Sequence, residues 1–209
     1  MRKKTGNKLH TWEAALLLAV AAALLWGACT LQRQDALEQK VIRLHVIANS
    51  DSEADQALKL RVRDRVLVLA EDILRQSRDM EEARQRLAEA LPRLQQTAAE
   101  EIAAQGSRYT VSAWLEETEF PTREYDGFAL PSGEYLALRV VIGEGAGKNW
   151  WCVVFPPLCT TAAADVPAAA LSAGLSEGEV ALITEADEGY VLKFKTVELW
   201  EKLKARLAE

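Results

Sequence analysis

An unbroken apolar run from Ala14 to Trp26 lies near the start of the chain and divides it into two parts of different character. Basic residues precede this run, and small residues follow it at Gly27 and Ala28. A basic start, an apolar stretch and a small-residue exit form the layout of an export signal. The positive flank is expected to stay in the cytoplasm while the rest of the chain crosses the membrane.

Whether this segment is removed after export stays open. The apolar run is shorter than the roughly 20 residues that cross a bilayer, but residues 9–31 hold few charges and can serve as an uncleaved anchor. A lipid on Cys29 and a buried core helix are the other interpretations. We divide the chain into an export signal or N-terminal membrane anchor (1–28), a linker (29–40) and an exported domain (41–209).

The composition limits what the exported domain can be. Apolar residues make up 49% of the chain, and six of its residues are Trp, which favours a packed core over a disordered chain. The formal net charge is −6, and the basic start belongs to the export segment, so the exported domain is more acidic than the whole. A nucleic-acid partner is not expected, because phosphate binding requires a basic surface.

The first half of the exported domain predicts one strand and two helices. Apolar residues alternate over 40–48 as in a strand, and residues 49–52 offer several helix caps. Apolar residues at helical spacing then predict helices over 53–75 and 80–105. Pro92 is expected to kink the second helix or divide it in two, because proline lacks the backbone donor.

The second half predicts mainly strands. Alternating segments cover 109–116, 134–142 and 150–155, and the glycine-rich turn between the last two indicates a hairpin. Residues 160–178 are interpreted as a surface excursion, and the chain is predicted to end in a short strand (190–195) and a helix (196–208). This order indicates an α+β fold, a small mainly antiparallel sheet with helices packed on one face, behind an N-terminal signal or anchor helix.

Two motifs for cofactors and metals fail when their details are checked. The glycines at 143, 145 and 147 precede Lys148 as in a phosphate-binding loop, but the spacing is short, Asn149 stands where Ser or Thr should follow, and no helix is predicted after them. His45 is the only histidine beyond the export segment and has no second histidine or cysteine at ligand spacing. We therefore predict no cofactor and no metal.

The cysteines of the exported domain are Cys152 and Cys159, which flank a stretch with a double proline. Export makes a disulfide between them possible. In a loop this short, its expected use is to hold a local surface shape. A catalytic pair of cysteine and His45, and two buried thiols, are the alternatives.

Polar residues gather around the junction between the first strand and the first helix. They form either an internal network of caps and ion pairs or a recognition surface, and the residue types alone do not separate these two interpretations. Neighbouring tryptophans further along the chain pose the same question, because Trp serves both in cores and as an interface anchor. Our candidates for partner binding are His45, Asn49, Asp51, Asp55, Arg61, Asp64, Trp150 and Trp151.

Several segments resemble the stage II sporulation protein R family of endospore-forming bacteria. The first block reads RLHVIANSDS over residues 43–52 and continues as LKLRVRD over 58–64. The second reads FPTREY over 120–125 and LPSGEY over 130–135, and it ends in GEGAGKNWWCVVFPPLC over 143–159. The last string is highly specific, and the chain after Cys159 resembles the family less clearly.

The resemblance implies an exported intercellular signal rather than an enzyme. Family members cross the forespore membrane into the intermembrane space, where they trigger a membrane-bound aspartic protease, stage II sporulation protein GA. That protease then removes the pro-sequence of sigma factor E. We expect the chain to bind the protease as a ligand. The alternative is a cell-envelope hydrolase that uses His45 with a nearby acidic residue or cysteine.

Overall fold

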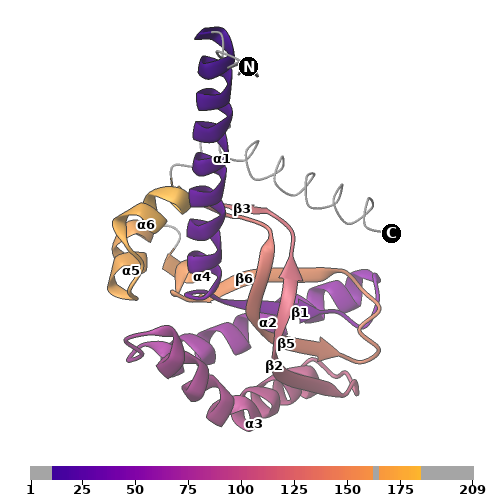
Figure 1. Cartoon of the computed structure of the whole chain (residues 1–209). Helices are drawn as coiled ribbons and strands as arrows, with labels where there is room; N and C mark the ends of the chain where they lie inside the picture. Colours follow the sequence, from indigo (N-terminus) through magenta and orange to yellow (C-terminus); the bar gives the residue numbers. More distant parts are fainter. Residues whose placement is uncertain (1–10, 162–164, 185–209) are drawn as a thin grey trace, which may run out of the picture. The chain divides into compact units, whose positions relative to one another are not determined.

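The computed structural model describes residues 11–161 and 165–184 (Figure 1). The chain divides into two compact units, the first ending at residue 36 and the second beginning at residue 37. Helix α1 (Thr11–Glu38) makes up the described part of the first unit and exposes the apolar side chains of Leu16, Leu17 and Leu18. It continues over most of the stretch that we predicted as a linker. No helix among the described residues combines the length and the hydropathy of a membrane span.

The second unit is built on a four-stranded sheet in the order β2-β5-β1-β6. Strand β1 (Ile42–Ile47) lies inside the sheet, and all six of its residues are buried. It pairs in parallel with β5 (Gly133–Ile142) and antiparallel with β6 (Asn149–Phe155), while β2 (Val111–Phe120) pairs antiparallel with β5. The α+β class is confirmed, and the sheet is mixed.

The predicted hairpin between β5 and β6 is wrong, because β1 lies between these two strands. The glycine-rich connection after β5 therefore passes over the end of β1 instead of making a tight turn. Neighbouring strands are about 4.8 Å apart, so this connection spans about 10 Å. Two glycines in it, Gly143 and Gly145, have positive φ angles of 58° and 63°, a region that side chains disfavour.

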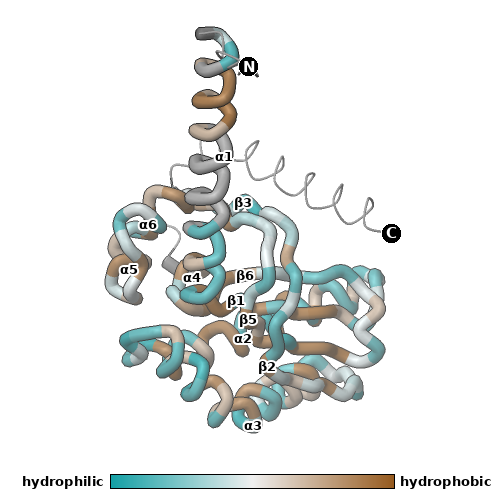
Figure 2. The backbone as a smooth tube through the Cα atoms, in the orientation of Figure 1, coloured by the Kyte–Doolittle hydropathy of each residue, from teal (hydrophilic) through white to brown (hydrophobic). Residues whose placement is uncertain are grey.

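One face of the sheet carries the helices α2 (Glu53–Leu74) and α3 (Met80–Ala104), as predicted. Ser52 caps α2 by accepting a hydrogen bond from the backbone of Asp55 at 3.2 Å. The apolar residues of β1 and β5 pack against both helices, and Figure 2 shows apolar residues concentrated along these strands. Helix α3 is not divided at Pro92, which lies on its exposed side, where water can satisfy the freed carbonyl.

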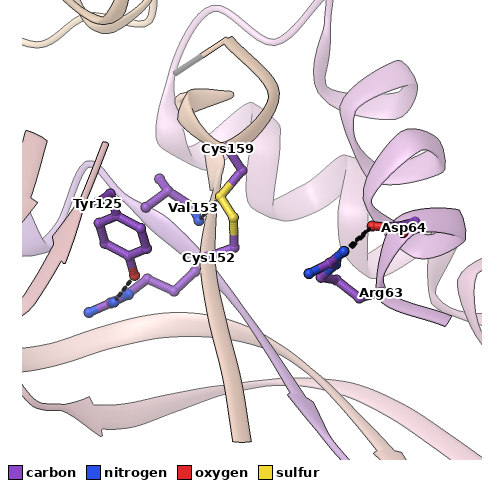
Figure 3. Close-up of a disulfide and its surroundings, with 7 residues drawn as sticks. Arg63, Asp64, Tyr125, Cys152, Val153 and Cys159 are labelled. Carbon is purple, nitrogen blue, oxygen red and sulfur yellow. Dashed lines mark hydrogen bonds and ion pairs between the residues drawn. A yellow bond between two sulfur atoms is a disulfide. The ribbon is translucent and has the colours of Figure 1, made fainter. Parts of the chain in front are cut away.

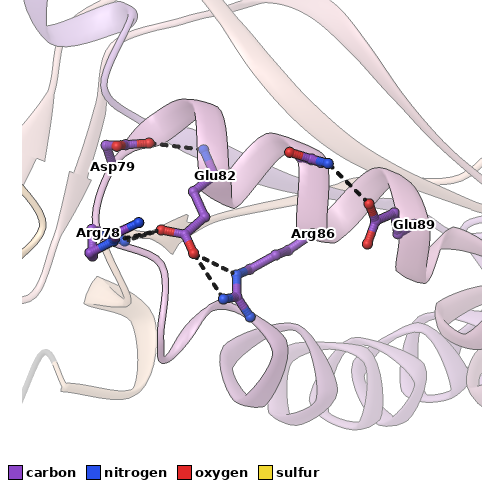
Figure 4. A network of polar contacts seen from close by, with 6 residues as sticks. Arg78, Asp79, Glu82, Arg86 and Glu89 are labelled. Carbon is purple, nitrogen blue, oxygen red and sulfur yellow. Dashed lines mark hydrogen bonds and ion pairs between the residues drawn. The ribbon is translucent and has the colours of Figure 1, made fainter.

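The start of α3 carries its own set of polar contacts (Figure 4). Asp79 caps the helix by accepting from the backbone N–H of Glu82 at 2.9 Å. The Glu82 carboxylate accepts hydrogen bonds from Arg86 and Arg78, and these bonds lower its pKa to about 2. The contacts satisfy helix ends and i,i+4 neighbours, so they serve the helix itself.

The other face of the sheet is covered as well, which corrects the expectation that helices pack on one face only. A small hairpin of β3 (Arg123–Tyr125) and β4 (Phe128–Leu130) lies there with three short helices and a second apolar core. These helices are α4 (Leu158–Thr161), α5 (Val166–Ser172) and α6 (Glu177–Thr184).

The described residues 165–178 are therefore not a surface excursion, because Val166 and Ala170 are buried in the second core. Lys40 also ties α6 to the chain before β1, since its Nζ atom lies 2.8 Å from the carboxylate of Glu179. The strand and helix that we predicted over 190–208 lie outside the described residues.

Candidate functional site

The polar junction between β1 and α2 is an internal network around the Asp55 carboxylate. Asp55 is only 7% exposed, and its Oδ2 atom accepts hydrogen bonds from Asn49 Nδ2 at 2.9 Å and Ser50 Oγ at 2.6 Å. These two bonds lower the pKa of the carboxyl group, so it is charged at neutral pH. Asn49 and Asp55 are thus brought together, with their polar atoms directed at each other.

The same junction holds the glycine-rich loop that follows β5. The backbone N–H groups of Ala146 and Gly147 donate to the carbonyls of Asn49 and Ala48 at 3.1 and 2.9 Å. Side chains add to this contact, since Asn49 Oδ1 accepts from the N–H of Glu144 at 3.0 Å and Asp51 Oδ1 from that of Lys148 at 2.7 Å. The loop is therefore fastened to the end of β1 by both backbone and side chains.

Lys59 completes the junction and was missed by the sequence analysis. Its side chain is 4% exposed, and its Nζ atom donates to Gln56 Oε1 at 2.7 Å and to the carbonyl of Lys148 at 2.9 Å. Burial lowers its pKa. A signal was present, because Lys59 follows Leu58 within the stripe that α2 buries, a place where lysine is rare.

His45 and Arg43 lie together on the face of the sheet opposite α2. Arg43 is fully buried, and its guanidinium donates to the Tyr125 hydroxyl at 2.5 Å and lies 4.1 Å from the ring centroid of Phe120. His45 is 7% exposed, and its ring lies 5.9 Å from that of Phe120. Burial lowers the pKa of His45, which leaves it neutral at pH 7.

The two tryptophans point to opposite faces of the sheet, because they are neighbours in β6. Trp151 lies 5.8 Å from the His45 ring, and the Arg123 guanidinium covers it at 4.0 Å. Trp150 is 36% exposed and lies under the guanidinium of Arg63 at 4.3 Å on the α2 side. Trp and Arg are both enriched in binding hot spots.

Of the remaining candidates, Asp64 and Arg61 lie on the exposed side of α2. The Asp64 carboxylate pairs with Arg63 at 2.6 Å, as Figure 3 shows, and its side chain is 61% exposed. Asp51 is also exposed although one of its oxygens holds the loop. The exposed candidates are therefore Asp51, Arg61, Asp64 and Trp150, whereas His45, Asn49, Asp55 and Trp151 are directed inward or shielded.

Cys152 and Cys159 form a disulfide that joins β6 to α4, with Cα atoms 6.1 Å apart (Figure 3). Cys159 Sγ also accepts a hydrogen bond from the backbone N–H of Val153 at 2.9 Å. Cys152 and His45 do not form a catalytic pair, because Cys152 pairs with Leu44 in the register and His45 pairs with Trp151. Neighbouring register positions place side chains on opposite faces of the sheet.

The described residues define a small disulfide-bonded α+β domain in which buried polar groups hold loops in place. No cluster of three His, Cys, Asp or Glu side chains that could hold a metal ion occurs in this part of the chain.

Comparison with known proteins places the domain in a family. The model of the stage II sporulation protein R family matches residues 38–165. A stage II sporulation protein R from Bacillus subtilis (strain 168) is 36% identical over 148 residues, which cover 69% of this chain and 66% of that protein. No solved structure matches the chain. The chain belongs to the stage II sporulation protein R family, and its role is in sporulation.

Proposed function

We propose that this protein is an exported intercellular sporulation signal that activates the membrane-bound aspartic protease, stage II sporulation protein GA, to process the precursor of sigma factor E. The observation that carries the proposal is membership of the stage II sporulation protein R family over residues 38–165. The protein acts as a ligand of the protease. Its partners are therefore the protease and, through its N-terminal segment, the membrane.

Export across the forespore membrane into the intermembrane space is supported by two features. The basic and apolar residues of 1–28 have the layout of a signal or anchor. The bond between Cys152 and Cys159 suits an oxidising compartment outside the cytoplasm, since such bonds are rare in cytosolic proteins.

Activation by a ligand requires that the ligand bind the active state of the protease more tightly than the inactive one. A rigid ligand loses little conformational freedom on binding, which favours affinity. The Asp55 network and the disulfide supply this rigidity. The exposed candidates Asp51, Arg61, Asp64 and Trp150 lie on parts of the chain that these contacts hold.

The test is to produce the protease and the sigma precursor in a bacterium that does not sporulate, together with the full chain or with a form that lacks residues 1–28. We expect precursor cleavage with the full chain and none with the truncated form, which stays in the cytoplasm. Cleavage that is equal with and without residues 1–28 contradicts the export step. Absence of cleavage with both forms, when all three proteins are detected, contradicts activation.

A variant separates the ligand from the hydrolase alternative. Because His45 is buried and neutral, His45→Gln should retain cleavage in the same cells as long as the variant stays folded. Complete loss of cleavage by a folded variant supports instead an active site that contains His45.

A further inference from the structure

The two outer strands of the sheet differ in how their free edges are covered. At the edge of β6, Cys159 Sγ accepts the outward N–H of Val153, and α4 lies against the strand. Strand β2 is ten residues long and forms the other edge among the described residues, where its pairing partner is β5. An exposed edge of this length is a template for a further strand unless something covers it.

The outward-facing backbone groups of β2 can be assigned from two hydrogen bonds. The carbonyl of Thr110 accepts from Gly143 next to β5, so even-numbered residues point toward β5. The N–H of Ala113 donates instead to the side chain of Gln95 at 3.3 Å. Because the pattern alternates along a strand, Leu115, Glu117 and Glu119 also point outward, and no backbone group outside the sheet pairs with them among the described residues.

A hollow lies beside this edge. Helix α3 packs along β2 (Figure 1), and its outer surface has an open hollow of about 400 Å³. Gln95 belongs both to this hollow and to the contact with Ala113. Apolar side chains that are only half-buried, those of Leu91, Ala113 and Leu115, meet along the boundary between helix and strand. The hollow is lined by Leu91, Pro92, Gln95, Gln96 and Ala99.

Acidic side chains lie at the far end of the same edge. Glu119 stands directly opposite Glu134 in the register, a like-charge pair that is unfavourable across strands. Burial raises the pKa of Glu117, and Glu134 raises it further, against the effect of Arg84. A cation placed here would relieve the repulsion among these carboxylates.

We propose that the β2 edge binds an extended segment of a partner protein, which adds a fifth strand to the sheet beside β2, next to the outer surface of α3. The segment carries apolar side chains that cover Leu91 and Leu115 and a basic side chain opposite Glu117 and Glu119. A second copy of this chain fits poorly, because β2 holds no basic side chain to place opposite these glutamates. The identification of this partner as the protease rests on the proposed function. Binding at the β2 edge itself is tested without the protease.

The test measures backbone hydrogen exchange of the full chain by NMR, with two end-blocked synthetic peptides as probes. One peptide alternates Val and Lys, and the other alternates Val and Glu. At ten times its dissociation constant, the basic peptide should slow exchange of the Leu115, Glu117 and Glu119 amides about tenfold, because exchange proceeds only from the free edge. The acidic peptide should leave these rates unchanged.

Two variants of β2 test the two parts of the proposal. Glu117→Pro removes an outward N–H without touching the bonds to β5, so the basic peptide should no longer protect Leu115 and Glu119. Glu117→Lys combined with Glu119→Lys keeps the backbone and should reverse the preference toward the acidic peptide. The matched control is Glu124→Lys with Glu144→Lys, which changes exposed glutamates away from this edge and should behave as the wild type.

Three results overturn the proposal. The first is the absence of protection at the β2 amides with either peptide while the chain is folded. The second is equal protection by both peptides or an unchanged preference in the double lysine variant. The third is protection that rises with protein concentration alone, which assigns the edge to a second copy of the chain. Failure of precursor cleavage with normal protection of β2 rejects the proposed function and leaves the edge intact.

Discussion

Replacing Asp55 by alanine tests whether the junction of β1 and α2 is a structural network. The change removes the acceptor of the bonds from Asn49 and Ser50 and leaves both donors without their partner. A hydrogen bond to a charged group contributes about 1.5–3 kcal/mol. Asn49 and Ser50 are half-buried and can partly bind water, so the lower value applies to each bond. The expected loss in the free energy of unfolding is about 3 kcal/mol.

This loss should depend on pH with a definite sign. The hydrogen bonds hold the pKa of Asp55 below its ordinary value of 3.8 in the folded state. The stabilisation is therefore complete well above pH 3.8 and disappears as the pH falls through the lower, folded-state pKa. The difference between the wild type and Asp55→Ala should stay constant between pH 7 and pH 5 and shrink below pH 4.

Urea denaturation of the full chain at pH 7, 5 and 3.5 measures these differences as shifts of the midpoint at an unchanged slope. Asp64→Ala is the matched control, because that side chain is 61% exposed and pairs with a neighbouring arginine. It should change stability by less than about 1 kcal/mol. A loss with Asp55→Ala that is no larger than with Asp64→Ala refutes the assignment of the junction as an internal network.

Three further predictions follow from the loop, the buried histidine and the disulfide. Gly147→Ala should lower the free energy of unfolding, measured by urea denaturation, by about 1–3 kcal/mol, because the added Cβ would overlap the carbonyl oxygen of Ser50. Gly178→Ala has open space around the added Cβ and should leave this free energy unchanged. The NMR titration of His45 should give a pKa below 6.5, because burial disfavours the charged ring. Stability should then fall as the pH drops below 6.5, where the unfolded chain binds the proton more readily. A pKa at or above 6.5 contradicts the burial of His45. Replacing Cys152 and Cys159 by serine should lower stability by about 2–3 kcal/mol, and a reductant should destabilise the wild type alone.

The strand and the two helices in the first half of the exported domain could be predicted from the sequence. The alternation over 40–48 gave β1, and the cap at Ser52 with a helical stripe gave α2, which begins at Glu53 as predicted. These signals are local, since they depend on which side of one strand or helix is buried. The start of α3 at Met80 was predicted for the same reason.

The pairing of the strands could not be predicted in the same way. The glycines after β5 indicated a hairpin, but a sequence does not show that β1, formed about a hundred residues earlier in the chain, takes the place beside β5. The short helices α5 and α6 were missed because they are only seven and eight residues long, and the burial of α6 depends on the distant β4.

For the candidate site, the sequence identified the polar residues but not their direction. Asn49, Asp51 and Asp55 follow β1 closely, and this density indicated either a network or a recognition surface. The choice depends on the glycine-rich loop, which accepts and donates hydrogen bonds at the same place although it lies about 95 residues further on. The β2 edge escaped the sequence analysis, because the position of a strand in the sheet order depends on distant pairing, which for the described residues leaves β2 outermost.

We proposed above that this protein activates the protease as a ligand and not as a catalyst. The direct measurement is precursor cleavage in membrane vesicles that contain the protease at known concentration, with the full chain titrated on the side that faces the intermembrane space. For a ligand, we expect cleavage to rise with the added protein and to saturate when the protease sites are filled. The protein concentration at half-saturation should not fall below half the protease concentration. Full activation by a small fraction of one equivalent, which persists after the protein is removed, contradicts it.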